Sequence, residues 1–348
     1  MIMKQIADWT ISENTQLSAD FCLLKVHLEN ELPKIRPGQF VQIRVPNASN
    51  TFLRRPISIH FVDYDRRELW LLVQMVGEGT RKLSKMRVGE SLNIIYPLGN
   101  GFTLPERNCH CGLDPQSPEK ETNVVQHNNI TQHSNAKQGI AGQARNDDGN
   151  DDGNGNDNDS FLPQTGGQFL LIGGGAGTAP LLYLGKQLRD LGYQPTFLLG
   201  GRTQYQLLQL SEFEKYGNVY TTTEDGSHGE KGFVTNHSIM QTYFSSIRLY
   251  RYEMQKHFDK IQMYSNPLSH PSPSTLHPTI YVCGPKPMML AVAKLAKQND
   301  VSCEVSLENR MACGIGTCLC CVEKTTFGNT CVCTAGPVFN INQLTWQI

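Results

Sequence analysis

Cysteine is concentrated near the end of this 348-residue chain, at a density that indicates metal or redox chemistry. Six of the eleven cysteines lie between Ala312 and Cys333, in the run ACGIGTCLCCVEKTTFGNTCVC. The other five are scattered along the chain, at Cys22, Cys109, Cys111, Cys283 and Cys303. The first residues include one early lysine and no long apolar run, so we expect no secretory signal and a cytoplasmic protein. Thiols stay reduced in that compartment, where clustered cysteines favour metal or redox chemistry over disulfides.

Three of these cysteines, Cys313, Cys318 and Cys321, have the spacing C-x4-C-x2-C. This is the plant-type ferredoxin arrangement for a [2Fe–2S] cluster, which a fourth, more distant cysteine completes. Gly314 and Gly316 allow the loop to curl around the cluster and to point backbone N–H groups at its sulfurs. The alternative is zinc, but zinc favours two well-spaced cysteine pairs, and the last two cysteines are only one residue apart.

Two cysteines are candidates for the fourth ligand, Cys331 and Cys333. The run VEKTTFGNTCVC predicts a hairpin that turns at Gly328-Asn329. In that register Cys333 lies nearer Cys321 than Cys331 does, by about 6–7 Å at roughly 3.3 Å per strand residue. We therefore predict Cys333 as the fourth ligand, with Cys320 and Cys331 as spare thiols.

The segments that precede the cysteine run predict two larger domains. FCLLKVHLE, GQFVQIRVP, RRPISIHFVDY and ELWLLVQMV are rich in Val, Ile, Leu and aromatic residues, and Pro or Gly separates them, which predicts an antiparallel barrel or sandwich over residues 1–105. From Gly167 the pattern becomes strand, Gly-rich turn and helix, as in QFLLI, GGGAGTAP and LLYLGKQLRDLG. This alternation predicts a parallel, doubly wound sheet over 166–300, with an irregular insertion at about 252–278 and a small cluster module at 301–348.

Residues 106–165 predict a low-complexity insertion between these domains. The run NDDGNDDGNGNDND contains no apolar residue and cannot contribute to a core. Asp148, Asn150, Asp152 and Gly153 match the start of a calcium-binding loop, but Asp159 replaces the usual Glu and no helices flank the run, so we favour a solvated insertion.

The Gly-rich turn predicts a phosphate-binding loop. Glycines allow the backbone to approach a phosphate, and free N–H groups at the helix start favour its negative charge. The standard dinucleotide fingerprint adds an acidic residue after the second strand, but that strand ends in Gly200-Gly201-Arg202. Pro180 also stands near the third-glycine position. The turn therefore departs from the standard fingerprint.

The Gly-rich turn with Pro180, and the later strand that ends in Cys283-Gly284-Pro285, resemble those of the ferredoxin–NADP reductase superfamily. In that superfamily a flavin barrel precedes a nicotinamide domain. The superfamily marks its flavin site with R-x-[YF]-[ST], and this chain has Arg55-Pro56-Ile57-Ser58, with Ile57 in the aromatic position. The resemblance implies an FAD site formed by Arg55, Pro56, Ile57, Ser58, Leu72, Val73, Gln74, Gly79 and Thr80. It implies an NAD site formed by Gly173, Gly174, Gly175, Gly177, Thr178, Cys283, Gly284 and Pro285.

The combination of RRPIS, GGGAGTAP, CGPKPMM and RMACGIGTC…CTAGPVF resembles the electron-transfer subunit of dihydroorotate dehydrogenase B, although Ala335 stands where that family has an acidic residue. The resemblance implies FAD, one [2Fe–2S] cluster, NAD and a separate FMN-containing catalytic subunit, in a heterotetramer that serves pyrimidine biosynthesis. Two alternatives remain: a reductase subunit of hydrogenase or sulfide dehydrogenase type, and a non-catalytic zinc module.

The sequence indicates half of an enzyme, since no base and binding site for dihydroorotate is evident. A net charge of −1 offers no electrostatic footprint for nucleic acid or an anionic membrane. No apolar run approaches the ~18 residues that a membrane-spanning helix needs. We therefore expect neither a nucleic acid nor a membrane as a partner.

Overall fold

The computed structural model describes residues 4–47, 51–105, 168–264 and 278–348. The expected insertion at 106–165, with its calcium-like pattern, lies outside these ranges. Within them, no helix is both long and apolar enough to cross a membrane.

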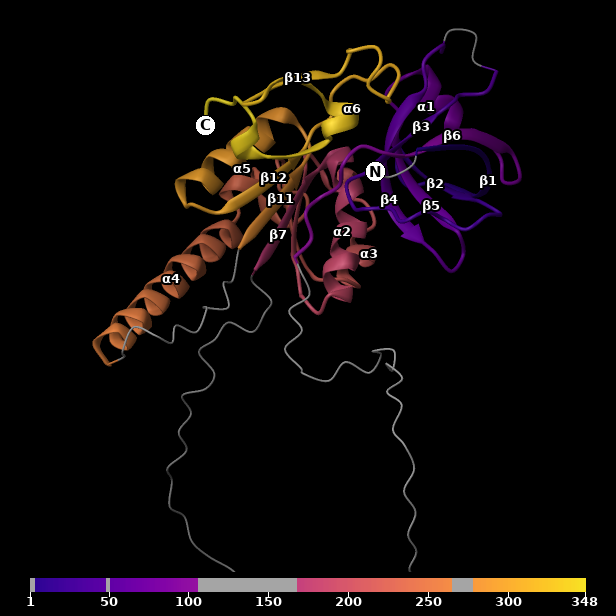
Figure 1. The fold of residues 1–348 in the computed structure, drawn as a ribbon. Helices are drawn as coiled ribbons and strands as arrows, with labels where there is room; N and C mark the ends of the chain where they lie inside the picture. Colours follow the sequence, from indigo (N-terminus) through magenta and orange to yellow (C-terminus); the bar gives the residue numbers. More distant parts are fainter. Residues whose placement is uncertain (1–3, 48–50, 106–167, 265–277) are drawn as a thin grey trace, which may run out of the picture. The chain divides into compact units, whose positions relative to one another are not determined.

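The first domain is a closed barrel of six antiparallel strands, in the order β1-β2-β5-β4-β3-β6 (Figure 1, indigo to purple). Its strands are β1 (Gln5–Gln16), β2 (Phe21–His27), β3 (Phe40–Ile43), β4 (Arg55–Asp63), β5 (Glu68–Gln74) and β6 (Ser91–Leu98). A short helix, α1 (Glu78–Leu83), follows β5. The four predicted strand segments are β2 to β5, and β1 and β6 close the barrel. Fully buried side chains such as Trp9, Leu24, Leu69 and Ile94 fill its core, so the predicted barrel is confirmed.

The second domain contains a seven-stranded sheet in the order β10-β9-β8-β7-β11-β12-β15. Its strands are β7 (Phe169–Gly174), β8 (Thr196–Gly201), β9 (Asn218–Thr223), β10 (Glu230–Lys231), β11 (Thr279–Cys283), β12 (Ser302–Ser306) and β15 (Val338–Asn340). All neighbours run parallel except β15, which is antiparallel to β12. The chain builds outward from β7 in one direction and then returns to add β11 on the other side. The order therefore reverses between β7 and β11, where ligands bind in doubly wound sheets.

Helices connect these strands: α2 (Ala179–Asp190), α3 (Leu210–Glu214), α4 (Ser238–Tyr264) and α5 (Lys286–Gln298). The irregular insertion predicted at 252–278 was wrong over its first part, because α4 continues to Tyr264. No Gly or Pro interrupts the sequence from Ser238 to Tyr264, so nothing in it ends the helix earlier. The predicted boundary at residue 300 also falls before two strands of the sheet, β12 and β15.

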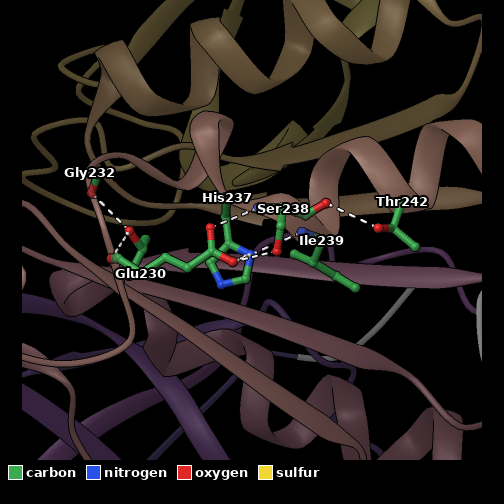
Figure 2. A network of polar contacts seen from close by, with 7 residues as sticks. Glu230, Gly232, His237, Ser238, Ile239 and Thr242 are labelled. Atoms are coloured by element: carbon green, nitrogen blue, oxygen red, sulfur yellow. Dashed lines mark hydrogen bonds and ion pairs between the residues drawn. The ribbon is translucent and has the colours of Figure 1, made fainter.

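The start of α4 is fixed by a polar network that Figure 2 shows. The Glu230 carboxylate accepts hydrogen bonds from the backbone N–H of Ser238, at 2.9 Å, and from its hydroxyl. These bonds lower the pKa of Glu230. The Ile239 N–H donates to Nδ1 of His237 at 3.0 Å. Glu230 thus satisfies donors that the helix itself leaves free, and it connects α4 to the edge of the sheet.

The cluster segment contains a small hairpin, β13 (Val322–Thr325) and β14 (Gly328–Cys331), followed by one helical turn, α6 (Val332–Ala335). The predicted turn at Gly328-Asn329 was wrong. Thr325 pairs with Gly328, so the turn is made by residues 326–327. The Thr325 hydroxyl oxygen accepts from the Phe327 N–H at 3.2 Å and its hydroxyl donates to the Gly328 carbonyl at 2.8 Å, which fixes this register.

Candidate functional site

The predicted flavin motif and the Gly-rich start of α1 lie against each other. A Cβ placed on Gly79 would lie 3.1 Å from Nε of Arg55 and 3.1 Å from Cγ2 of Thr51. Nε of Arg55 is buried and has no hydrogen-bond partner among the described residues. A guanidinium with a spare, buried Nε–H beside a glycine suits a phosphate oxygen, because charge-assisted hydrogen bonds to phosphate are among the strongest in proteins. These residues fit the pyrophosphate of FAD.

The other residues predicted for FAD divide between two environments. Thr80 is nearly buried, and its hydroxyl donates to the Gly77 carbonyl at 3.2 Å. Val73 and Ile57 pack in the large hydrophobic core that includes the barrel interior, so stacking of Ile57 on a flavin ring stays a prediction. Leu72 instead packs with Ala176 and Ala179 of the Gly-rich turn. Among the remaining predicted residues, Pro56 and Ser58 pair across to β3 and Gln74 pairs with β2.

The Gly-rich turn and the Cys-Gly-Pro segment meet at the point where the strand order reverses. β7 leads into the single 3₁₀ turn Gly175–Thr178, and Cys283 ends β11 in register with Gly173. A Cβ on Gly177 would lie 2.4 Å from backbone atoms of Cys283 and Gly284. Only glycine permits this approach. The structure therefore brings together the predicted NAD residues, Gly173, Gly174, Gly175, Gly177, Thr178, Cys283, Gly284 and Pro285.

A cleft of about 660 Å³ borders this point. Residues 17–21 of the barrel and residues 203–208, which follow β8, line it. Leu17, Phe21 and Leu208 from this lining also pack with Ala176 of the Gly-rich turn. Arg202 lies one residue before the lining segment and is exposed. The cleft therefore lies beside the Gly-rich turn, between the barrel and the segment that follows β8.

Sequence reasoning missed Glu308 and His60, two polar residues that border this region. Sγ of Cys283 lies 4.0 Å from a carboxylate oxygen of Glu308, and burial together with that carboxylate raises the pKa of Cys283 well above its usual value. Cys283 is therefore a protonated thiol at neutral pH. His60, from β4, contacts the Ala179 carbonyl at 2.7 Å and Oε1 of Gln209 at 2.9 Å. Burial lowers the pKa of His60 and outweighs these two contacts, which raise it. No sequence motif identifies Glu308 or His60, because their partners are distant in the chain and only the fold brings them close.

The loop that carries the first three cysteines is arranged to hold thiolates. The Ile315 N–H donates to Sγ of Cys313 at 3.5 Å. Burial raises the pKa of Cys313, but N–H groups that include those of Ile315 and Cys318 outweigh burial and lower this pKa to about 6. The Cys318 thiol also hydrogen-bonds to Cys313. Donors that stabilise a thiolate are what an iron–sulfur site requires.

The fourth cysteine reaches this loop by a route that the sequence did not predict. Because Cys331 pairs with Val322, it lies close to Cys321. The single turn of α6 then folds Cys333 back, so that its backbone N–H donates to Sγ of Cys321 at 3.3 Å. Cys333 is 1% exposed. Both candidate thiols therefore lie beside Cys321, and the choice of Cys333 stays a prediction.

The four predicted ligands form two adjacent pairs, Cys313 with Cys318 and Cys321 with Cys333. Across the described ranges, no three Cys, His, Asp or Glu side chains converge on a point where one ion could bind. A [2Fe–2S] cluster distributes four thiolates over two irons, so pairs of cysteines fit it.

Comparison with known proteins gives the same division of the chain. Residues 8–102 match the family model of an oxidoreductase FAD-binding domain. Residues 308–345 match that of the iron–sulfur cluster binding domain of dihydroorotate dehydrogenase B. A solved NADH-dependent reduced ferredoxin-NADP oxidoreductase shares the fold, with a TM-score of 0.61 at 22% identity, over 98% of this chain and 90% of that chain.

Curated relatives match almost the full length. An electron transfer subunit of dihydroorotate dehydrogenase B (NAD(+)) from Geobacillus sp. (strain WCH70) is 31% identical over 92% of this chain and 91% of its own. The subunit of the same description from Fusobacterium nucleatum is 30% identical, with 96% of both chains covered. At this identity and coverage, the chain belongs to the family of dihydroorotate dehydrogenase B (NAD(+)) electron transfer subunits.

Proposed function

We propose that this chain relays electrons from the FMN of a dihydroorotate dehydrogenase catalytic subunit, through a [2Fe–2S] cluster and FAD, to NAD in pyrimidine biosynthesis. The observation that carries the proposal is the position of the cluster loop. Gly314 of that loop lies against Gln42 of β3, the strand that pairs with the flavin motif on β4. The Gly-rich turn meets β5 of the same barrel through Leu72. The barrel thus contacts both sites between which electrons must pass.

Each set of residues has a defined task in this proposal. A flavin is the cofactor that joins the one-electron chemistry of a cluster to the two-electron chemistry of nicotinamide. Arg55 and Gly79 hold its phosphates, and the Gly173–Gly177 turn holds those of NAD. The protonated thiol of Cys283 adds no charge beside the nicotinamide site. Cys313, Cys318, Cys321 and Cys333 ligate the cluster. We place the protein in the cytoplasm, where thiols stay reduced and remain available as cluster ligands.

The isolated chain should reduce a dye or ferricyanide with NADH but should not oxidise dihydroorotate. Addition of the FMN-containing subunit should restore dihydroorotate-dependent NADH formation, in a complex that we propose to contain two of each chain. Steady-state assays with and without the partner, together with the mass of the complex, test this. Dihydroorotate oxidation by the chain alone would refute the proposal, and coupling only to a hydrogenase or sulfide dehydrogenase partner would replace it.

The surface beside the cluster is the proposed contact with that partner. Ile315 and Leu319 flank Cys318, and their side chains are 44% and 65% exposed. Leu319 also has a φ of +57°, a left-handed conformation that Asn or Gly would adopt at lower cost. An exposed apolar residue in a strained conformation is better explained by a contact than by folding.

We expect Leu319→Asp to lower coupled dihydroorotate oxidation at least tenfold while the cluster and its EPR signal are retained. The charge would have to be desolvated in the interface, whereas Asp tolerates the backbone conformation. Tyr252→Asp, at an equally exposed position on α4 (64%), serves as control and should leave coupling unchanged. Titration of each variant with the partner measures the loss; equal loss in both would remove the argument for this surface.

A further inference from the structure

Gln42 is buried at the contact between the barrel and the cluster loop without any satisfied side-chain hydrogen bond. Its side chain is 0% exposed, and both Nε2 and Oε1 lack a partner among the described residues. Buried polar groups in native proteins are hydrogen-bonded with few exceptions, since an unpaired donor or acceptor loses its water without compensation. An amide in this state indicates that a group absent from the polypeptide itself completes its bonding.

Two contacts show where that group must lie. Gln42 pairs with Pro56 of the flavin motif, and residues directly opposite in an antiparallel pair present their side chains on the same face. On the other side, a Cβ on Gly314 would lie 2.6 Å from both Cγ and Nε2 of Gln42. Gly314 has a φ of +70° and directly follows the ligand Cys313. The amide therefore lies between the flavin motif and the cluster loop.

A second glutamine nearby is also buried, so burial alone does not distinguish Gln42; the absence of side-chain partners among the described residues does. Gln39, three residues earlier, is 1% exposed. Its Oε1 accepts from the Arg36 N–H at 2.7 Å and its Nε2 donates to the Gly99 carbonyl at 2.8 Å. The protein satisfies Gln39 internally but leaves Gln42, which faces the cluster loop, unsatisfied. Gln39 therefore has a structural role, whereas the free donor and acceptor of Gln42 are suited to a bound group.

We propose that Gln42 is a positioning residue whose Nε2–H donates to a sulfur of the bound [2Fe–2S] cluster and thereby sets the cluster's reduction potential relative to FAD. This inference rests on the cluster site of the proposed function. A sulfur offers an acceptor, and a cluster gains negative charge when it is reduced. A hydrogen bond to its sulfur consequently favours the reduced form and raises the potential. An apolar residue of the same shape would lose this effect.

Gln42→Met keeps the length of the side chain and removes its donor. In the FAD- and cluster-loaded protein we expect the electron-transfer equilibrium between flavin and cluster to shift about tenfold towards the flavin, which is 59 mV for a one-electron couple. The measurement is an EPR-monitored redox titration of the cluster beside an optical titration of the flavin. Gln39→Met removes an equally buried amide and should leave the cluster potential unchanged, although it lowers thermal stability.

Resonance Raman spectra supply a readout that a merely structural role would not change. The Fe–S stretching modes should show a smaller shift on transfer to D₂O in Gln42→Met than in the wild type. If Gln42→Met fails to load its cluster, Gln42→Leu removes the same donor with a shorter apolar side chain and should lower the potential in the same direction. An unchanged cluster potential in a loaded variant, or a shift confined to the flavin, would overturn the inference. Dihydroorotate coupling is measured separately, so the two proposals can fail independently.

Discussion

Serine at Cys333 should remove the [2Fe–2S] EPR signal and stop coupled orotate formation, whereas serine at Cys331 should leave both in place. The structure makes this comparison informative, because both thiols lie beside Cys321. Cys333 is 1% exposed and joined to Cys321 through its backbone N–H, while Cys331 is half-buried at the end of β14. Cys321 is itself buried, so we expect the buried thiol of Cys333 to be its neighbour at the cluster. We expect iron content and EPR amplitude to fall to background in Cys333→Ser.

The same measurement extends to the rest of the segment. Serine at Cys313, Cys318 or Cys321 should also abolish the cluster, and serine at the exposed Cys320 should not. NADH should still reduce the flavin in every variant by stopped-flow absorbance, because residues 8–102, which match an FAD-binding domain, contain none of these cysteines. Loss of the signal in Cys331→Ser with retention in Cys333→Ser would exchange the two assignments. If the wild-type protein contains zinc and negligible iron, the assignment of a [2Fe–2S] cluster to this segment is wrong.

The sequence predicted the architecture well where short-range patterns determine it. Runs rich in Val, Ile, Leu and aromatic residues, separated by Gly or Pro, identify β2 to β5, and the Gly-rich turn after β7 identifies the start of α2. The hairpin register was wrong because a Gly-Asn dipeptide is a good turn in isolation, whereas the Thr325 hydroxyl stabilises a turn two residues earlier. Moving the turn by two residues changes each cross-strand partner by four, an even number, so both registers present the same faces and side-chain alternation cannot distinguish them.

The residues that sequence reasoning missed share a different property. Gln42, His60 and Glu308 belong to no motif, and each acquires its meaning from a partner distant in the chain. The Gln42–Gly314 contact joins positions that lie in the first and last parts of the sequence. Such pairs depend on how the barrel packs against the cluster segment, which periodicity does not report. Orphaned polar atoms are the signal that identifies Gln42, and they are visible only in the folded chain.

Substitution of Arg55 by Leu should weaken FAD binding ten- to a hundredfold while the cluster remains. Hydrogen bonds to charged groups contribute about 1.5–3 kcal/mol, which corresponds to that range of affinity. Arg55 can supply such a bond, because its Nε is buried beside Gly79 with no partner among the described residues. Flavin released on gel filtration, and the FAD concentration that restores NADH–ferricyanide activity, measure the effect.

The neighbouring arginine provides the matched control for this prediction. Nη1 of Arg54 donates to the carbonyl of Asn93 at 2.9 Å and to that of Gln42 at 3.3 Å. Nη2 donates to the Asn93 side chain. Because these bonds connect β3 and β6, Arg54→Leu should lower the midpoint of thermal unfolding and leave FAD affinity nearly unchanged in the folded protein. Arg55→Leu should do the reverse, since no internal bond of its Nε is lost. Equal loss of FAD in both variants would mean that the positive charge of this strand, rather than the free donor of Arg55, holds the flavin phosphates.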